Sequence, residues 1–252
     1  MKKTVYVILI VVLIGVFGYS AYRLGDYYMA KYKSDKCTAQ AAQHVHVVEK
    51  PNLDGPQKED EPETEPDHLE VDFDALWKLN KDIVAWIYCP GTPINYPVVQ
   101  SEDNDYYLRR LLDGTWNIGG TLFLDYRCSA DFSGINSIIY GHHMKSGTMF
   151  GSLVRYRNQS YYNEHPVVFL VTPYGQYRVE LFAGCTIDAM DGIYEPNPSP
   201  EQVERLKQQS TFVPSADTAT EGPILTLSTC AHDFENARYV VLGRLVPIEP
   251  AE

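Results

Sequence analysis

An unbroken apolar run near the N-terminus, residues 5–17, constrains this chain more than any other feature of its sequence. It continues through Gly18 and Tyr19 towards Tyr22, so it is about 18 to 19 residues long, close to the roughly 20 that a helix needs to cross a bilayer. Because a backbone in hydrocarbon must satisfy its own hydrogen bonds, the segment is expected to be helical. A cleaved signal peptide is the alternative, but it would have a shorter apolar region and a clearer cleavage site. We therefore expect a retained membrane anchor over residues 4–22.

The charge of the chain is strongly acidic and unevenly distributed. The formal net charge is −12, which argues against a nucleic-acid-binding protein, because such proteins present a basic face. Residues 51–66 are acidic and proline-rich and have almost nothing apolar to bury. We expect residues 35–68 to form a disordered or extended spacer and the folded domain to begin near Glu70. Basic residues lie on both sides of the apolar run, so they do not decide its orientation.

Beyond the spacer, alternating apolar residues and turn signals predict many short strands and few helices. Strands are expected at residues 84–88, 94–99, 121–124, 137–140, 167–172, 176–182, 224–229 and 239–246. Pro97 moves the second of these towards an edge or a bulge. Helices are expected at residues 73–79, at residues 105–112, and after Ser199, where Pro200 and Gln202 complete a capping box. This pattern is typical of a mainly β domain, a barrel or a sandwich with peripheral helices.

The five cysteines are Cys37, Cys89, Cys128, Cys185 and Cys230, and an odd number outside the cell leaves at least one thiol unpaired. None of them forms a CxxC pair, which argues against a zinc knuckle or a thioredoxin-like site. We expect Cys89, Cys128 and Cys185 to be small buried hydrophobic residues. The acidic clusters contain no EF-hand loop, so we predict no metal ion, and we predict no cofactor.

Two segments carry residues that suit covalent catalysis. An apolar strand runs into Gly141, where the glycine lets the backbone turn, and His142 and His143 follow. A second apolar strand ends in Cys230, and after a short polar loop Arg238 opens the next strand. A thiolate is a nucleophile, an imidazole transfers protons, and an arginine donates to a carbonyl or an oxyanion. By spacing alone, a structural cysteine with a surface histidine and arginine remains an equal alternative.

These residues resemble the motifs of a known family. TLSTC (residues 226–230) is similar to the TLxTC signature of sortases, and YGH (residues 140–142) to the segment that carries the sortase catalytic histidine. Arg238 matches the arginine on the strand after the cysteine. Further segments are similar to class B sortases, namely NYPVVQ (95–100), DNDYYL (103–108), GGTLFLD (119–125), MFGSL (149–153) and the helix before the final strands. Together they span most of residues 70–246.

The resemblance implies a closed eight-stranded barrel with peripheral helices and a cysteine transpeptidase activity. In this family the cysteine, here Cys230, attacks the carbonyl of a threonine within a five-residue sorting signal. His142 would protonate the leaving amine, and Arg238 would hold the substrate carbonyl or the tetrahedral oxyanion. An amine of cell-wall peptidoglycan or a pilin lysine then takes the acyl group. For class B the family suggests an Asn/Ser-Pro-x-Thr-Gly/Asn signal.

The resemblance also suggests a domain plan. Residues 1–3 would be the cytoplasmic N-terminus, 4–22 the single-pass transmembrane anchor, 23–69 the extracellular acidic stalk and 70–252 the catalytic domain. The N-terminus would lie inside the cell and the catalytic domain outside. The expected partners are proteins that bear a sorting signal, the amine that accepts them and the lipid bilayer, and no nucleic acid.

The resemblance points to further positions around Cys230. Ser228, Asn104 and Leu108 match class B positions that line the substrate groove, and Thr229 is added as a neighbour of the nucleophile. Without a binding role, Ser228 would be an ordinary strand hydroxyl, Asn104 a capping residue and Leu108 a core leucine. His143 is the rival of His142 for the histidine role, and the family match favours His142. His232 is interpreted as a loop residue near the thiol.

Two other functions are compatible with parts of the sequence. An extracellular cysteine peptidase of another fold would only hydrolyse, but papain-like enzymes place the cysteine before the histidine, and here His142 precedes Cys230. A non-enzymatic surface module on a stalk would share the anchor and the spacer. It differs from an enzyme in tolerating the loss of Cys230, because no other group could form the thioester.

Overall fold

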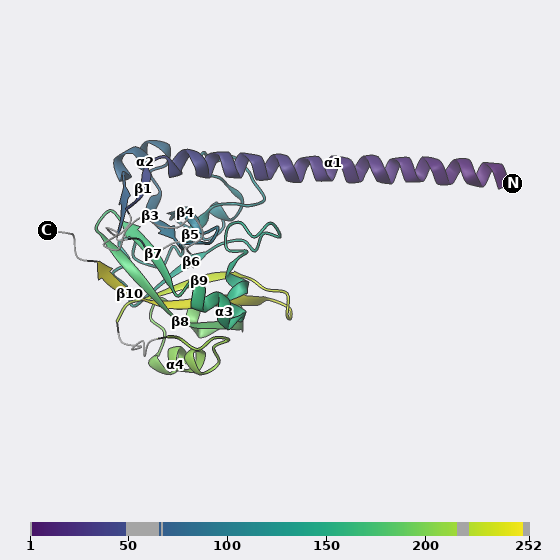
Figure 1. Ribbon diagram of the computed structural model, residues 1–252. Coiled ribbons are helices and arrows are strands. Elements are labelled where there is room, and N and C mark those ends of the chain that lie inside the picture. The colour runs from purple at the N-terminus through teal and green to yellow at the C-terminus, as the bar shows by residue number, and fades with distance from the viewer. Residues whose placement is uncertain (1, 49–65, 67, 216–221, 249–252) are drawn as a thin grey trace, which may run out of the picture.

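The computed structural model describes residues 2–48, 66, 68–215 and 222–248 of the chain (Figure 1). The elements in chain order are α1 (Lys2–Ala42), β1 (Val45–Val48), β2 (His68–Val71), α2 (Phe73–Leu79), β3 (Ile83–Tyr88), β4 (Asn95–Val99), the 3₁₀ turn η1 (Tyr107–Arg109), β5 (Leu122–Leu124), β6 (Asn136–Tyr140), the 3₁₀ turn η2 (Leu153–Arg157), α3 (Gln159–Glu164), β7 (Val167–Thr172), β8 (Gly175–Asp188), the 3₁₀ turn η3 (Gly192–Tyr194), α4 (Pro200–Gln208), β9 (Ile224–Cys230) and β10 (Ala237–Ile248).

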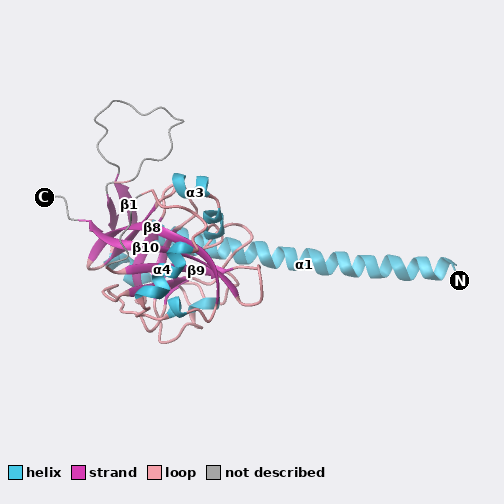
Figure 2. Ribbon diagram, turned by 90° about the horizontal axis from the view of Figure 1, so that it is seen from below, coloured by secondary structure: helices cyan, strands magenta, loops and turns pink. Residues whose placement is uncertain are grey.

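Eight of these strands close into a barrel in the order β10-β8-β7-β3-β4-β5-β6-β9, which confirms the expected fold class. Two neighbouring pairs are parallel, β4 with β5 and β6 with β9, and the other six are antiparallel. Figure 2 shows the helices around the strands, with α1 leaving the domain on one side. The parallel pair β6–β9 matters most here, because both strands lead to predicted site residues.

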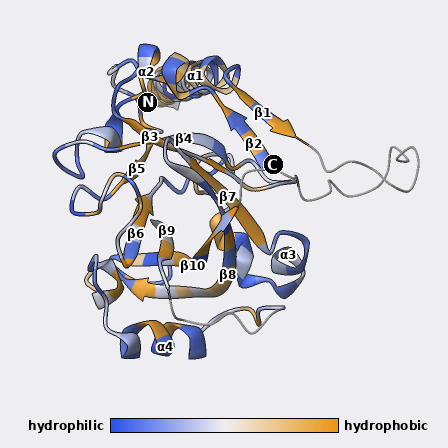
Figure 3. Ribbon diagram, turned by 90° about the vertical axis from the view of Figure 1, so that its left-hand side faces the viewer, coloured by the Kyte–Doolittle hydropathy of each residue, from blue (hydrophilic) through white to orange (hydrophobic). Residues whose placement is uncertain are grey.

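The barrel closes because nearly every strand is apolar enough to be buried. All six residues of β7 are buried, and so are the first six residues of β9. β7 and β8 form the predicted hairpin, with Thr172 opposite Gly175 across the turn. Figure 3 shows the barrel strands largely hydrophobic and the outer helix α4 largely hydrophilic. Burial of these apolar faces is the main favourable contribution to such a fold.

The helices on the barrel surface follow their local signals. α4 begins after Ser199, whose side chain accepts from the backbone of Gln202 while the Gln202 side chain bonds back, so the predicted capping box is confirmed. α4 buries Val203 and Leu206 against the barrel. α2 spans the predicted residues, and Asp72 caps its N-terminus.

Two local expectations were wrong. Residues 105–112 contain only the 3₁₀ turn η1, because Asp103 accepts hydrogen bonds from the backbone of Asp105 and Tyr106 and holds a turn there instead. β4 is not an edge strand, since it lies between β3 and β5. Pro97 is tolerated because the pairing with β5 uses only Val98 and Val99, and the irregular register lies in β3.

The N-terminal part of the domain differs from the expected spacer. α1 runs without interruption to Ala42, and β1 pairs antiparallel with β2, with Val48 opposite His68. Ala41 is buried together with Leu69 and Leu76, so the folded domain begins within α1 rather than near Glu70. Residues 35–48 are therefore not an extended spacer, because their apolar side chains have a core to join. Residues 49–65, which hold most of the acidic proline-rich segment, lie outside the described residues.

Candidate active site

Three neighbouring strands bring the predicted catalytic residues to one end of the barrel. β9 lies between β6 and β10. Cys230 at the end of β9 pairs with Arg238 on β10, and Tyr140 on β6 pairs with Ser228. β6 and β9 are parallel, and the Gly141 backbone donates to the Ser228 carbonyl at 3.0 Å. His142, two residues beyond Tyr140, is therefore level with Cys230, two residues beyond Ser228.

A groove with a volume of about 310 Å³ opens over this end of the barrel. Its described lining residues are Asn104, Leu108, Thr121, Phe123, Arg127, Tyr140, Gly141, His142, Ala189, Tyr194, Ser228, Thr229, Cys230 and Arg238. All seven residues singled out from the sequence are among them. The structure thus brings these side chains together, while the role of each one stays a prediction.

Cys230 differs from the other cysteines of the barrel. Cys89, Cys128 and Cys185 are buried, as expected, and burial raises the pKa of these thiols to about 11, about 11 and about 12. Such thiols stay protonated and unreactive at neutral pH. Cys230 is half-buried and lines the groove. It is the cysteine that a substrate in this groove would meet.

The two adjacent histidines point to different partners. His142 lines the groove, and its Nε2 donates to the carbonyl of Leu108 at 2.7 Å. Burial lowers the pKa of His142, and the bond to Leu108 offsets part of that effect. His143 donates through Nδ1 to the backbone carbonyl of Cys230 at 2.8 Å and stacks on His232. His143 is outside the set of described groove residues, so the geometry favours His142 as the histidine that meets a substrate.

Gly141 matters through packing rather than through a turn. It does not adopt a positive φ, so the expectation that its freedom bends the backbone was wrong. A Cβ atom at this position would lie 2.4 Å from Leu122 Cδ2 and 2.7 Å from the ring of Phe150. The glycine therefore lets the end of β6 lie close against these two side chains, and this close packing positions His142.

Arg238 faces the groove from the strand on the other side of Cys230. Its guanidinium donates to the backbone carbonyls of Ala237 at 3.0 Å and Asn236 at 3.3 Å. Both contacts use the same nitrogen, NH1, which leaves other N–H groups of the fork to contact a bound carbonyl oxygen. A permanently charged, planar donor beside a thiol suits the stabilisation of an oxyanion.

The floor of the groove contains hydroxyl groups. Ser228 is buried, and its hydroxyl is hydrogen-bonded to the Tyr194 hydroxyl at 2.8 Å. Tyr194 stacks on Tyr140, with ring centroids 5.9 Å apart. The Thr229 hydroxyl is buried with no hydrogen-bond partner among the described residues. Tyr194 was not singled out from the sequence and Tyr140 entered only as part of the YGH segment, because aromatic residues that converge from distant segments give no local signal.

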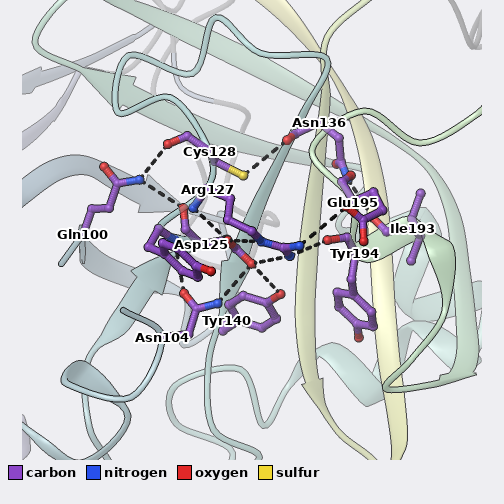
Figure 4. Close-up of polar contacts among 11 residues, drawn as sticks. Gln100, Asn104, Asp125, Arg127, Cys128, Asn136, Tyr140, Ile193, Tyr194 and Glu195 are labelled. Carbon is purple, nitrogen blue, oxygen red and sulfur yellow. Dashed lines mark hydrogen bonds and ion pairs between the residues drawn. The ribbon is translucent and has the colours of Figure 1, made fainter. Parts of the chain in front are cut away.

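A buried carboxylate supports one wall of the groove (Figure 4). Asp125 follows β5, has no exposed surface, and accepts from Arg127 Nε and NH2 at 3.0 Å each. Asn104 Nδ2 donates to it at 3.1 Å and the Tyr140 hydroxyl at 3.0 Å. Burial acts to raise the pKa of Asp125, but the contacts with Arg127, Asn104 and Tyr140 outweigh it and hold the pKa below its usual range.

The Asp125 contacts fix groups that line the groove. Asn104 is held at both ends, because its Oδ1 also accepts from the backbone of Tyr126 at 3.1 Å. Arg127 continues the connection by donating to the carbonyl of Tyr194 at 2.6 Å. The sequence comparison included Asp125 in a class B segment without giving it a role, and a buried carboxylate of this kind is recognisable only in three dimensions.

In the described part of the chain, no group of three or more His, Cys, Asp or Glu side chains is placed to hold an ion. The arrangement that the structure does show is a half-buried thiol, an imidazole and a guanidinium around one groove. These groups suit acyl transfer through a covalent intermediate.

Comparisons with known proteins agree with this geometry. Residues 87–246 match the model of the sortase domain family. Sortase B of Listeria monocytogenes is 32% identical over 247 residues, covering 94% of this chain and 95% of that protein. The structure of a Staphylococcus aureus sortase B–substrate complex is similar, with a TM-score of 0.66 and 30% identity over 70% of this chain and 85% of the other. Sortase B from B. anthracis in complex with AAEK1 has a TM-score of 0.68 and 30% identity, covering 87% of this chain and 99% of the other.

The family match covers the barrel from the end of β3 to β10, and the relative from Listeria monocytogenes covers 94% of the chain. The motifs, the closed barrel and these relatives all lead to the same assignment. The chain belongs to the sortase family of cysteine transpeptidases, and its relatives place it among the class B sortases.

Proposed function

We propose that this protein cleaves a C-terminal sorting signal after its threonine and transfers the acyl group to an amine, with Cys230 as the nucleophile. The observation that carries the proposal is the strand register, which puts His142 just beyond the end of β6 and Arg238 on β10, the two strands that flank β9 and Cys230 at the groove. Nucleophile, proton carrier and oxyanion donor then act on one bound carbonyl group.

In the first half of the reaction the Cys230 thiolate attacks the carbonyl carbon of the threonine. The carbonyl oxygen becomes an oxyanion, which the Arg238 guanidinium stabilises by donating N–H groups. The carbon–nitrogen bond then breaks, and the leaving amine takes a proton from the His142 imidazolium. The products are a thioester on Cys230, a neutral His142 and the released C-terminal peptide.

In the second half an incoming amine attacks the thioester carbonyl. Neutral His142 accepts the proton that the amine loses, and the carbon–sulfur bond breaks to release the thiolate. The new carbon–nitrogen bond is an amide bond like the one that was broken. The two steps together therefore exchange one amide for another and need no external energy source. We propose an amine of cell-wall peptidoglycan or a pilin lysine as the acceptor.

Substrate recognition is assigned to the groove wall. We propose that Asn104, Leu108, Ser228 and Thr229 contact an Asn/Ser-Pro-x-Thr-Gly/Asn type of signal. Thr229 lies between Ser228 and Cys230 at the end of β9 and lines the same groove, which supports its place in this set. The similarity to a sortase B that is solved in complex with a substrate supports substrate binding by this domain.

We further propose that residues 4–22 cross the membrane, with residues 1–3 inside the cell and the catalytic domain outside. The helix that contains this segment is long and apolar enough for a span. In this plan residues 23–42 are the helical continuation of the anchor and not a stalk, and the catalytic unit includes the end of α1.

The proposal is tested by chromatography of a peptide panel containing Pro-x-Thr, with and without an added amine. We expect Cys230→Ala to give no product, and His142→Ala to lose on the order of a hundredfold or more in rate. His143→Ala is the matched control and should stay within a few-fold of the parent. Arg238→Lys should lose most activity, because an ammonium group does not reproduce the planar fork.

The same assay separates the alternatives. A transpeptidase converts peptide and amine into a new amide, and the yield of that product rises with amine concentration. Formation of the free acid only, at every amine concentration, would indicate a hydrolytic cysteine peptidase. Equal activity of the parent and Cys230→Ala would contradict the proposed nucleophile.

A further inference from the structure

The membrane anchor and the catalytic domain are joined by one rigid helix. α1 is continuous over Lys2–Ala42, and its last turns pack into the domain through buried Ala41. In the second half of the helix, the Asn117 side chain donates to the carbonyl of Ala30 at 2.8 Å, which attaches the loop before β5 to α1. Because β1 pairs with β2, Val48 lies opposite His68, so the chain between these two residues adds no length between anchor and barrel.

A continuous helix fixes the height of each residue above the bilayer. The hydrocarbon core is about 30 Å thick, and a helix rises 1.5 Å per residue, so roughly 20 residues cross it. Counted from residue 4, the core ends near Arg23, which is also the first charged residue after the apolar run. The headgroup region adds roughly 5 to 8 Å on each side, which corresponds to about the next five residues of the helix.

The loop before β5 faces α1 from this level to the turns beyond it, since the hollow between them runs from Arg23 to Lys33 and Asn117 is bonded to Ala30. Trp116 and Ile118 lie against a surface hollow whose other walls include Arg23, Tyr27 and Lys33 of the helix. Trp116 is 68% exposed and Ile118 is 39% exposed, so neither side chain has a place in the core. Tryptophan and tyrosine, with arginine or lysine nearby, are the side chains that favour the membrane–water interface.

The catalytic end of the barrel points the same way. In Figure 1 the connection between β9 and β10 lies on the side towards which α1 extends, and the β10 arrow points to the opposite side. Cys230 and Arg238 are at the ends of β9 and β10 that this connection joins. The opposite end of the barrel carries the β7–β8 turn with Tyr174, next to the pairing of Gln176 with Ile248.

We propose that Trp116 and Ile118 form a second membrane contact, inserting into the headgroup region of the same bilayer that α1 crosses. The contact would hold the catalytic end of the barrel towards the lipid surface, so that the helix and the loop together set its orientation. This inference rests on the proposed membrane anchor, and it adds a docking surface that the transpeptidase chemistry itself does not require.

The test uses the full chain reconstituted into vesicles of phosphatidylcholine and phosphatidylglycerol. Trp77→Phe leaves Trp116 and buried Trp86 as the two fluorescent tryptophans. A second variant that also carries Trp116→Phe retains Trp86 alone, so the difference between the two emission spectra is the emission of Trp116. Lipids that bear a shallow spin label quench tryptophan in the headgroup region, and acrylamide quenches tryptophan in water. We expect the Trp116 emission to be lost with labelled lipid and to be protected from acrylamide.

A matched control comes from the far end of the barrel. Tyr174 is 77% exposed, and Tyr174→Trp in the variant without Trp77 and Trp116 places an exposed reporter there. That reporter should respond to acrylamide and not to the labelled lipid.

Three outcomes decide the matter. Trp116 emission that is quenched by lipid, with the Tyr174→Trp reporter unaffected, supports the contact. Trp116 emission that responds to acrylamide alone, in protein that stays in the vesicles after a carbonate wash, overturns the contact and leaves the anchor intact. Release of the protein by the carbonate wash overturns the anchor and the contact together, while peptide transfer in solution remains a separate readout of the proposed function.

Discussion

Neutralising the buried carboxylate behind the groove should weaken both the fold and substrate binding. In Asp125→Asn, one carboxylate oxygen becomes an NH₂ group of nearly the same size, so no cavity forms. That group faces the N–H donors of Arg127 and Asn104, which cannot accept a hydrogen bond, and the Tyr140 hydroxyl, which can. The variant therefore leaves donors without an acceptor and removes the charge that pairs with Arg127.

The magnitude follows from burial. Each buried donor left unpaired costs about 1–3 kcal/mol, and the Arg127 side chain is 34% exposed, so water compensates part of its loss. We expect the free energy of unfolding to fall by about 2–4 kcal/mol, measured by urea denaturation of the soluble domain. Glu195→Gln is the matched control, because Glu195 contacts the same guanidinium at 3.6 Å but is 64% exposed. Such a surface pair contributes about 0–1 kcal/mol.

The stability difference should depend on pH in a defined direction. The pKa of Asp125 is lowered on folding, so its carboxylate stabilises the native state fully above the unfolded pKa of about 3.9. That contribution is lost as the pH falls through the lower, folded pKa. The difference in free energy of unfolding between the parent and Asp125→Asn should therefore be constant from pH 5 to 8 and should become smaller at lower pH. A gap below about 0.5 kcal/mol at pH 7, or one that widens in acid, would refute the reasoning.

Three further changes have expected outcomes. Because burial lowers the pKa of His142, the acid limb of a plot of kcat/KM against pH should have its midpoint below the ordinary histidine pKa of about 6.5. A midpoint clearly above that value would contradict the assignment of this limb to His142. Gly141→Ala should destabilise the domain by about 1–3 kcal/mol in a denaturation experiment and reduce activity, because its Cβ meets Leu122 and Phe150. Gly134→Ala, with open space around it, is the control, and equal effects of the two would count against the packing argument. Ser199→Ala should cost about 1 kcal/mol of unfolding free energy by loss of the α4 cap, with peptide turnover unchanged; an unchanged thermal midpoint would show that the cap is not needed.

The parts of the fold that the sequence predicts well are those with local causes. The β7–β8 hairpin and the capped helix α4 depend on turn and cap chemistry within a few residues, and both are confirmed. Closure of the barrel depends on pairings such as β6 with β9, which join residues that are far apart in the chain. Only the resemblance to a family supplied that closure, because strand periodicity leaves a sandwich equally possible.

The expectations that failed did so where distant partners decide the structure. The end of α1 was assigned to a spacer together with the acidic, proline-rich segment that follows it, but Ala41 and Cys37 pack against a core contributed by later segments. The role of Gly141 was attributed to backbone freedom, whereas close contacts with Leu122 and Phe150 decide it.

The candidate site shows the same division. Cys230, His142 and Arg238 carry short motifs that are visible in sequence. Asp125 and Tyr194 reach the groove through contacts between separate segments, and their importance becomes visible only when those segments are placed together.

The central claim is that Cys230 carries the acyl group during transfer, and the intact mass of the protein tests it most directly. The soluble domain and its Cys230→Ala variant are each incubated with Pro-x-Thr peptides. The intact mass of each protein is measured by mass spectrometry before and after addition of oligoglycine or a diaminopimelate-type amine. We predict a mass gain equal to the acyl fragment in the parent only, which disappears when the amine is added. The same mass gain in Cys230→Ala, or no adduct with any peptide in the panel, would contradict the claim.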